Sequence, residues 1–195
     1  MEKTYDDLPP WGSPDGVELL NANPVVVVER GGQLMDGNFD LITTAGTKLG
    51  SVVLETAEVG QFFDVTQTPT YRILDAHGQP IGVIVRSGTL AHYRFMVLDM
   101  SGKPFGLIED GGTTVYSQLM TAADGTVYRM IRGVYAGSGW GFSDGHSHLG
   151  NISTLSREKG HHYTINLSSS LVGAHRLLLL LTPVIVDYGE HPERR

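Results

Sequence analysis

The fold is decided by Leu171-Val-Gly-Ala-His-Arg-Leu-Leu-Leu-Leu-Leu-Thr-Pro-Val-Ile-Val-Asp187, near the carboxyl end of the chain. Five successive leucines lie in the middle of this stretch: Leu177, Leu178, Leu179, Leu180 and Leu181. A helix of such residues is apolar on every side, so it has to be surrounded on every side. A membrane span needs about 20 apolar residues, whereas a run of about 10–14 is more typical of a buried core helix. The shorter run found here predicts a buried helix.

Polar residues and a proline set the limits of this helix. We expect it to extend over about residues 170–187, with Asp187 as a structural residue near its end. His175 and Arg176 should lie at the mouth of the fold, where their polar ends stay in water. Pro183 should kink the helix or confine it to its first three turns. A membrane tail anchor is the alternative, but Pro183 and the charged segment 190–195 count against it.

Composition indicates one globular domain. The chain has 195 residues, of which 41% are hydrophobic and 18% are charged, as in ordinary soluble proteins. The 25 glycines indicate many turns, as an all-β chain requires. The absence of cysteine excludes disulfides, a thiolate zinc site and a cysteine nucleophile, and it fits a reducing cytosol. Residues 1–7 lack the apolar core of a signal peptide, so we expect a cytoplasmic protein.

Charge restricts the classes of partner. A net charge of −7 argues against nucleic-acid binding, which needs clustered Lys and Arg, and it opposes non-specific attraction to anionic membranes. A local basic pocket stays open as an alternative. Residues 1–23 are acidic and rich in Pro and Gly, so they predict a flexible arm before a domain over 24–189 and a charged tail over 190–195.

A repeated cassette fills the middle of the chain. Residues 71–84 align with residues 95–108, and less regular copies occupy 39–50 and 119–127. Each copy predicts a β-hairpin, because an aromatic residue and alternating aliphatic residues precede a turn residue and a glycine. The turn positions of the two clearest copies are Asp75, Gly78, Asp99 and Gly102. We expect the aspartates to cap the turns and the glycines to adopt the left-handed conformation. Calcium binding is the alternative, but one carboxylate per hairpin is too few oxygens.

The strand count predicts the architecture. We expect twelve strands, at 25–29, 38–43, 49–54, 62–66, 70–74, 80–86, 92–99, 105–109, 115–121, 127–135, 150–156 and 161–167. No amphipathic helix interrupts them, so the sheet should be antiparallel. An open sheet of this size would expose two edges, which closure into a barrel removes. The apolar helix is suited to fill the barrel. The predicted fold class is therefore a mainly β, closed antiparallel barrel of about twelve strands around a buried hydrophobic C-terminal helix.

This order of elements resembles the tubby-like superfamily, and within it the phospholipid scramblases and the LURP-one-related proteins. The match depends on the cassette, on the last strand His162-Tyr-Thr-Ile-Asn-Leu167, and on the helix ending Val184-Ile-Val-Asp-Tyr188. The resemblance implies a twelve-stranded barrel threaded by its C-terminal helix. It also implies phosphoinositide binding, as in tubby proteins, or lipid scrambling or a calcium response, as in scramblases. The chain departs from these families because it lacks a cysteine cluster, an acidic calcium segment and long basic segments.

Arginines on predicted strands are the candidate ligand-binding residues: Arg86, Arg94, Arg129 and Arg132. On a barrel wall they would form an anion pocket that binds a lipid headgroup through bidentate contacts. The alternative is that they pair with neighbouring acids or lie along the surface.

The segment 137–148 is the longest predicted loop, and it carries two further hypotheses. His146 and His148 are weak candidate metal ligands, together with His161 and His162, because imidazoles suit zinc, copper or nickel. Ser143, Asp144 and His146 suggest a hydrolase, but three neighbours in one glycine-rich loop do not assemble a nucleophile, a base and an oxyanion hole.

We therefore expect a non-enzymatic barrel module without a cofactor or a physiological metal. Its expected partner is an anionic phospholipid headgroup or a protein, with no nucleic acid and no transmembrane span, and its location is cytoplasmic, with peripheral membrane association left open. A structural or protein-interaction module without a small ligand is one alternative. An enzyme that uses the 137–148 loop is the other.

Overall fold

A computed structural model describes residues 14–30, 38–55, 70–88, 93–111, 118–132, 139–157 and 160–184 of the chain. The described strands are β1 (Val25–Arg30), β2 (Asn38–Ile42), β3 (Lys48–Leu54), β4 (Thr70–Asp75), β5 (Pro80–Gly88), β6 (Tyr93–Asp99), β7 (Pro104–Asp110), β8 (Gln118–Ala122), β9 (Val127–Arg132), β10 (Trp140–Ser143), β11 (His148–Arg157) and β12 (Gly160–Leu167). The described helices are α1 (Pro14–Asn21) and α2 (Gly173–Leu180).

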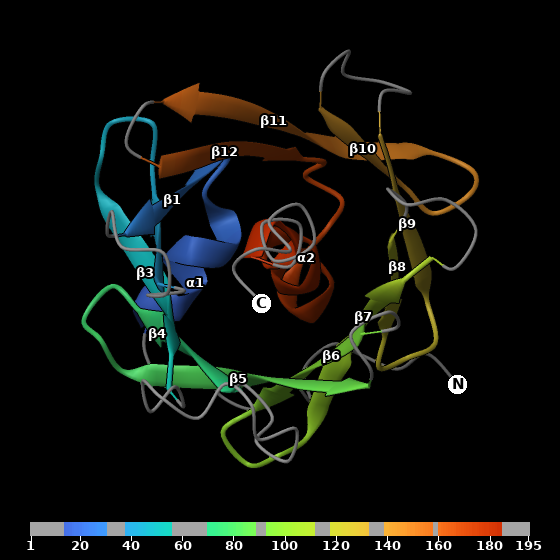
Figure 1. Cartoon of the computed structure of the whole chain (residues 1–195), viewed down its shortest axis with the longest axis horizontal. Coiled ribbons are helices and arrows are strands. Elements are labelled where there is room, and N and C mark those ends of the chain that lie inside the picture. The colour runs from blue at the N-terminus through green and yellow to red at the C-terminus, as the bar shows by residue number, and fades with distance from the viewer. Residues whose placement is uncertain are drawn as a thin grey trace.

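The strands form one closed antiparallel barrel. Each strand pairs with its neighbours in the sequence, and β1 closes the ring by pairing with β12. Viewed along the barrel axis, the strands surround α2 (Figure 1). The predicted fold class is confirmed. Among the described residues, no helix has the length and apolar character that a membrane crossing requires.

The helix α2 fills the barrel. Residues Leu177 to Leu181 are at most 1% exposed, and α2 packs against β7 and β8. The helix is shorter than the predicted 170–187, because α2 ends at Leu180 and a further helical turn follows only over 182–184. Pro183 explains this end, since it has no N–H to bond the carbonyl of Leu179, and the hydroxyl of Thr182 donates to that carbonyl. Asp187 and the tail 190–195 lie outside the described residues.

The hairpin turns explain the repeated cassette. Asp75 Oδ1 accepts the backbone N–H groups of His77 and Gln79, and Asp99 Oδ1 accepts those of Ser101 and Lys103. Both aspartates are buried, so they cap the turns from inside the barrel. Gly78 and Gly102 adopt φ values of 81° and 85°, which disfavour other residues.

The second glycine of each cassette has a separate role. At Gly106 on β7, a Cβ atom would lie 2.6 Å from the carbonyl oxygen of Thr121 and 2.9 Å from Leu178 Cδ2. The missing side chain therefore lets the neighbouring strand β8 and helix α2 approach the backbone of β7.

Two elements differ from the sequence prediction. Residues 14–21 were expected to belong to a flexible arm over 1–23, but they form the helix α1. Leu19 and Leu20 of this helix are buried in the core. The helix lies inside the ring of strands, where it packs against β3, β4 and α2 (Figure 1). The short helix was missed because turn residues dominate the sequence around it. The predicted loop 137–148 contains strand β10, which pairs with β9 and β11 and was missed because it has only four residues. The predicted strand 62–66 lies outside the described residues.

Candidate functional site

The two ends of the barrel differ in their connections. The tight turns 43–47, 76–79, 100–103, 123–126 and 144–147 lie at one end, because the strands alternate in direction. The segment 168–172, which leads from β12 into α2, begins at the same end. We call this the turn end.

The four arginines predicted to form one anion pocket do not converge on a single site. Arg86 on β5 pairs with Phe95, which is buried, so Arg86 lies on the inward-facing row and is partly buried. Arg94 on β6 pairs with the next residue of β5, Ser87, and it therefore faces outward, because neighbouring positions of a strand point to opposite faces. Arg132 on β9 pairs with Trp140 through its backbone, and its side chain lies outside the described part.

Two of the four arginines do share one face. The strand register connects Arg94 to Glu109, Glu109 to Leu119, and Leu119 to Arg129. This arginine row crosses β6, β7, β8 and β9 on the outside of the barrel. Three strand spacings separate its two arginines, about 14 Å. Arg94 Nε donates to Glu109 Oε2 at 3.1 Å while its side chain stays 64% exposed. Arg129 is also exposed and makes no ion pair within the described part of the chain.

An apolar row runs beside the arginine row. The register connects Val85, Met96, Leu107, Thr121 and Val127 across β5 to β9. Each member of the apolar row lies two residues along its strand from the arginine row, about 7 Å away. The two rows therefore face the same side of the sheet, the outside of the barrel. Met96 and Val127 are each 43% exposed, which is high for large apolar side chains. We call the outward-facing rows of β5 to β9 the outer wall.

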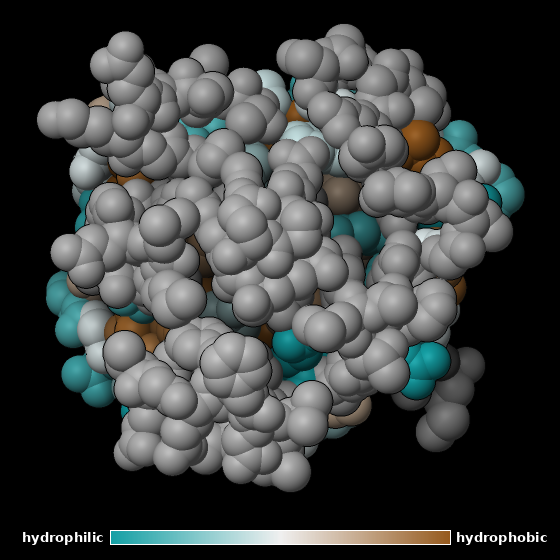
Figure 2. Space-filling model, in the orientation of Figure 1, coloured by the Kyte–Doolittle hydropathy of each residue, from teal (hydrophilic) through white to brown (hydrophobic). Residues whose placement is uncertain are grey.

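The opposite side of the barrel is more polar. On β11, β12 and β1, Thr164 lies between Ser153 and Val26, and Asn166 pairs with Asn151. The end-on view of Figure 2 shows hydrophobic and hydrophilic residues side by side around the rim of the barrel. The outer surface is therefore not uniform around the barrel circumference.

The histidines proposed as metal ligands do not converge. His146 lies in the turn before β11 and His148 begins that strand, whereas His162 pairs with Leu155 near the far end of β11. Seven strand positions separate His148 from Leu155, about 23 Å. The side chain of His161 lies outside the described part. No cluster of three or more metal-binding side chains occurs among the residues that the structure describes.

The candidate serine, aspartate and histidine of the 137–148 segment form a capped turn. Asp144 Oδ1 accepts the N–H groups of Ser147 and His146, and these hydrogen bonds lower the pKa of Asp144. Ser143 Oγ accepts the N–H of Gly145. The carboxylate thus holds the turn backbone and does not orient an imidazole toward the serine.

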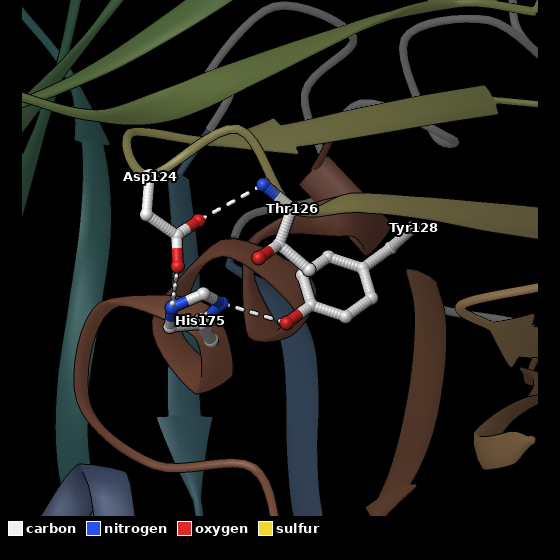
Figure 3. A network of polar contacts seen from close by, with 4 residues as sticks. All are labelled: Asp124, Thr126, Tyr128 and His175. Carbon is white, nitrogen blue, oxygen red and sulfur yellow. Dashed lines mark hydrogen bonds and ion pairs between the residues drawn. The ribbon is translucent and has the colours of Figure 1, made fainter. Parts of the chain in front are cut away.

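A polar network that the sequence analysis missed lies at the turn end (Figure 3). His175, in the first turn of α2, has Nδ1 2.6 Å from the hydroxyl of Tyr128 and Nε2 3.4 Å from Asp124 Oδ2. Burial would raise the pKa of Asp124, but hydrogen bonds from the backbone and side chain of Thr126 and the nearby His175 lower it. The contacts were missed because only the fold brings position 175 beside the β8–β9 turn. The prediction that the polar end of His175 stays in water is wrong, since its side chain is 12% exposed and bonded to Tyr128. Both imidazole nitrogens are engaged, so the network fastens α2 to the wall.

The prediction that Arg176 stays in water is wrong. Arg176 is 4% exposed, and its guanidinium donates to the carbonyls of Ala22 at 2.7 Å and Ser168 at 3.2 Å. Burial lowers the pKa of Arg176 from its ordinary value. The side chain therefore connects the segments that enter β1 and leave β12, and it is not placed to receive a ligand from solvent.

Comparison with known proteins shows the fold alone. Neither a protein-family model nor a curated protein matches the sequence. A solved structure of a protein from Arabidopsis thaliana, AT5G01750, matches with a TM-score of 0.53 and 12% sequence identity. The match covers 88% of this chain and 94% of that chain, so the likeness extends over nearly the whole barrel.

Proposed function

We propose that this protein is a non-enzymatic barrel of the tubby-like type that binds an anionic phospholipid headgroup on its outer wall. The observation that carries the proposal is the arginine row, in which Arg94 and Arg129 face outward from one continuous register. Within this proposal the protein is cytoplasmic and associates with membranes peripherally.

The guanidinium groups are suited to phosphate. A guanidinium presents paired N–H donors that match phosphate oxygens, and its charge persists at every physiological pH. Arg129 makes no ion pair in the described part of the chain, so its donors are open to a ligand. Arg94 is shared with Glu109, but exposed ion pairs contribute only about 0–1 kcal/mol, and a phosphate can compete for it.

The spacing of the row favours two headgroups over one. A separation of about 14 Å between the two arginines along the row exceeds the reach of a single phosphate. The site is therefore a surface on which lipids bind side by side, and it differs from the single pocket of four arginines that the sequence suggested.

The arrangement of the candidate catalytic residues supports the proposal that the protein is not an enzyme. The only serine, aspartate and histidine that the sequence put forward as a catalytic set form a capped turn, with Asp144 bound to backbone N–H groups. A catalytic histidine would need a carboxylate that orients it and a nucleophile within reach. In the network of His175, Asp124 lies beside one imidazole nitrogen and the hydroxyl of the buried Tyr128 is bonded to the other, so both nitrogens are engaged within the fold.

Co-sedimentation of the full chain with vesicles tests the proposal. Vesicles of phosphatidylcholine alone should retain no more protein than they retain albumin. Vesicles that also contain phosphatidylserine or a phosphoinositide should retain the protein at physiological salt, and retention should fall as salt screens the arginines. Retention equal to albumin on every anionic composition would reject lipid binding and favour the protein-partner alternative.

A further inference from the structure

The outer wall exposes apolar side chains beside its cations. Four large apolar side chains of the described residues are strongly exposed: Met96, Met100, Val127 and Val172. Met96 and Val127 belong to the apolar row, and Met100, which is 51% exposed, lies in the turn between β6 and β7. Exposed apolar residues that gather on one face mark an interaction surface, whereas scattered ones need no explanation.

The charges of this wall complement an anionic partner. On β6 to β9 and their turns, the described exposed cations are Arg94, Lys103 and Arg129. The described acids there that are not buried are Glu109, which is bound by Arg94, and Asp124, which lies in the β8–β9 turn 3.4 Å from His175. In a chain with a net charge of −7, the wall is therefore a local region where positive charge is available.

The partner has to bind through side chains. The described strands form a closed barrel, so β5 to β9 offer no free edge to which another strand can add. The wall presents two parallel rows about 7 Å apart. One carries the arginines, and the other carries Met96, three aliphatic side chains and Thr121. The same layering occurs at a membrane surface, where phosphates lie above the first methylenes of the acyl chains.

We propose that the apolar row enters the interfacial region of an anionic membrane, so that the partner of the outer wall is a lipid surface and not a headgroup free in solution. The inference rests on the proposed function and extends it. The arginine row contacts phosphates, while Met96 and Val127 are buried among the upper acyl chains. The apolar row lies nearer to the turn end than the arginine row does, so the barrel then tilts with its turn end toward the membrane.

Methionine methyl NMR on the full chain tests this arrangement with an internal control. Met96 and Met100 are exposed on the wall and its turn, whereas Met120 and Met130 are buried inside the barrel. Vesicles of phosphatidylcholine and phosphatidylserine with a lipid spin-labelled near the headgroup should broaden the signals of Met96 and Met100 more than those of Met120 and Met130. Uniform broadening, or none at Met96 while the protein is bound, would overturn the inference.

Matched variants separate this inference from the proposed function. Met96→Gln with Val127→Thr should lower the partition onto these vesicles about fivefold or more, because apolar area stays in water. Val26→Thr repeats the Val127→Thr change on β1, outside the wall, and should leave the partition unchanged. If the wild type binds anionic vesicles and the wall variant binds equally well, headgroup binding stands and the inference is wrong. If the wild type binds no anionic vesicle, the proposed function itself is wrong.

Self-association is the competing use of an apolar wall. Light scattering should give the same molar mass for the wild type and for Met96→Gln with Val127→Thr. A wild-type dimer that the variant converts to a monomer would assign the wall to a second copy of the chain and overturn the membrane inference.

Discussion

The imidazole Nδ1 of His175 lies 2.6 Å from the hydroxyl oxygen of Tyr128, with the two rings edge to face at 90°. His175 begins the central helix and Tyr128 belongs to β9, so this hydrogen bond joins the helix to the wall. Tyr128 is next to Arg129 in the sequence, and the two side chains face opposite sides of β9. The strand that anchors the helix inside the barrel is thus the strand that presents an arginine outside it.

The first prediction concerns this hydrogen bond. Tyr128→Phe removes the hydroxyl and His175→Ala removes its partner, so each change should destabilise the fold. A double-mutant cycle measured by urea unfolding should give a coupling energy of about 1 kcal/mol, the usual contribution of a buried hydrogen bond. Strictly additive effects would show that the two groups do not interact in solution.

The second prediction separates two kinds of glycine. Gly106→Ala places a Cβ atom against the carbonyl of Thr121 and against Leu178, so the strand or the helix has to move. We expect a loss of about 2 kcal/mol or more in the free energy of unfolding. Gly102→Ala meets no atom within 4 Å but sits at φ 85°, so it should cost only about 1 kcal/mol. Equal effects in thermal or urea unfolding would contradict the close approach of α2 to β7.

The third prediction concerns Arg176. Its guanidinium spans the carbonyls of Ala22 and Ser168, and a lysine ammonium is too compact to reproduce this fork. Arg176→Lys should therefore destabilise the protein by about 1–3 kcal/mol, because at least one buried carbonyl loses its donor. Arg94→Lys, on the exposed surface, should change stability by less than about 0.5 kcal/mol. Similar midpoints of unfolding for the two variants would contradict the buried role of Arg176.

The fourth prediction is a dependence on pH. Burial would raise the pKa of Asp99, but hydrogen bonds from Ser101 and Lys103 outweigh it and lower the pKa below its ordinary value. A carboxyl whose pKa is lower in the folded state stabilises the fold above its unfolded pKa, about 3.9, and loses that contribution as pH falls through the folded pKa. Urea unfolding should therefore show that Asp99→Asn costs more stability at pH 6 than at pH 2.5. A difference that stays constant, or grows on acidification, would refute the assigned sign.

Much of the fold can be predicted from local patterns in the sequence. Leu177 to Leu181 require burial on every side, and the repeated turn residues Asp75, Gly78, Asp99 and Gly102 mark two hairpins. Such signals predict a barrel around a helix, because they depend on neighbours in the chain. The helix α1 and the strand β10 were missed since they are short, and their burial depends on elements far away in the sequence.

The candidate site was predictable only in part. The sequence identifies the arginines on strands, but the face that each arginine occupies depends on the strand register. Arg86 pairs with Phe95, the residue after Arg94, so Arg86 and Arg94 lie on opposite faces of the sheet. The contact of His175 with Tyr128 spans 47 positions, and no local pattern marks it. The exposed Met96 and Val127 look like core residues in the sequence, because alternation alone does not say which row faces the barrel interior.

The central claim is that the outer wall binds an anionic membrane through its arginine row. The most direct measurement is the partition of Arg94→Gln with Arg129→Gln onto phosphatidylserine-containing vesicles. At about 1 kcal/mol for each basic residue near the surface, partition should fall about thirtyfold. Lys48→Gln with Arg72→Gln removes the same charge from ion pairs outside the wall and should change the partition little. An equal loss in both double variants, or no loss in the first, would contradict the claim.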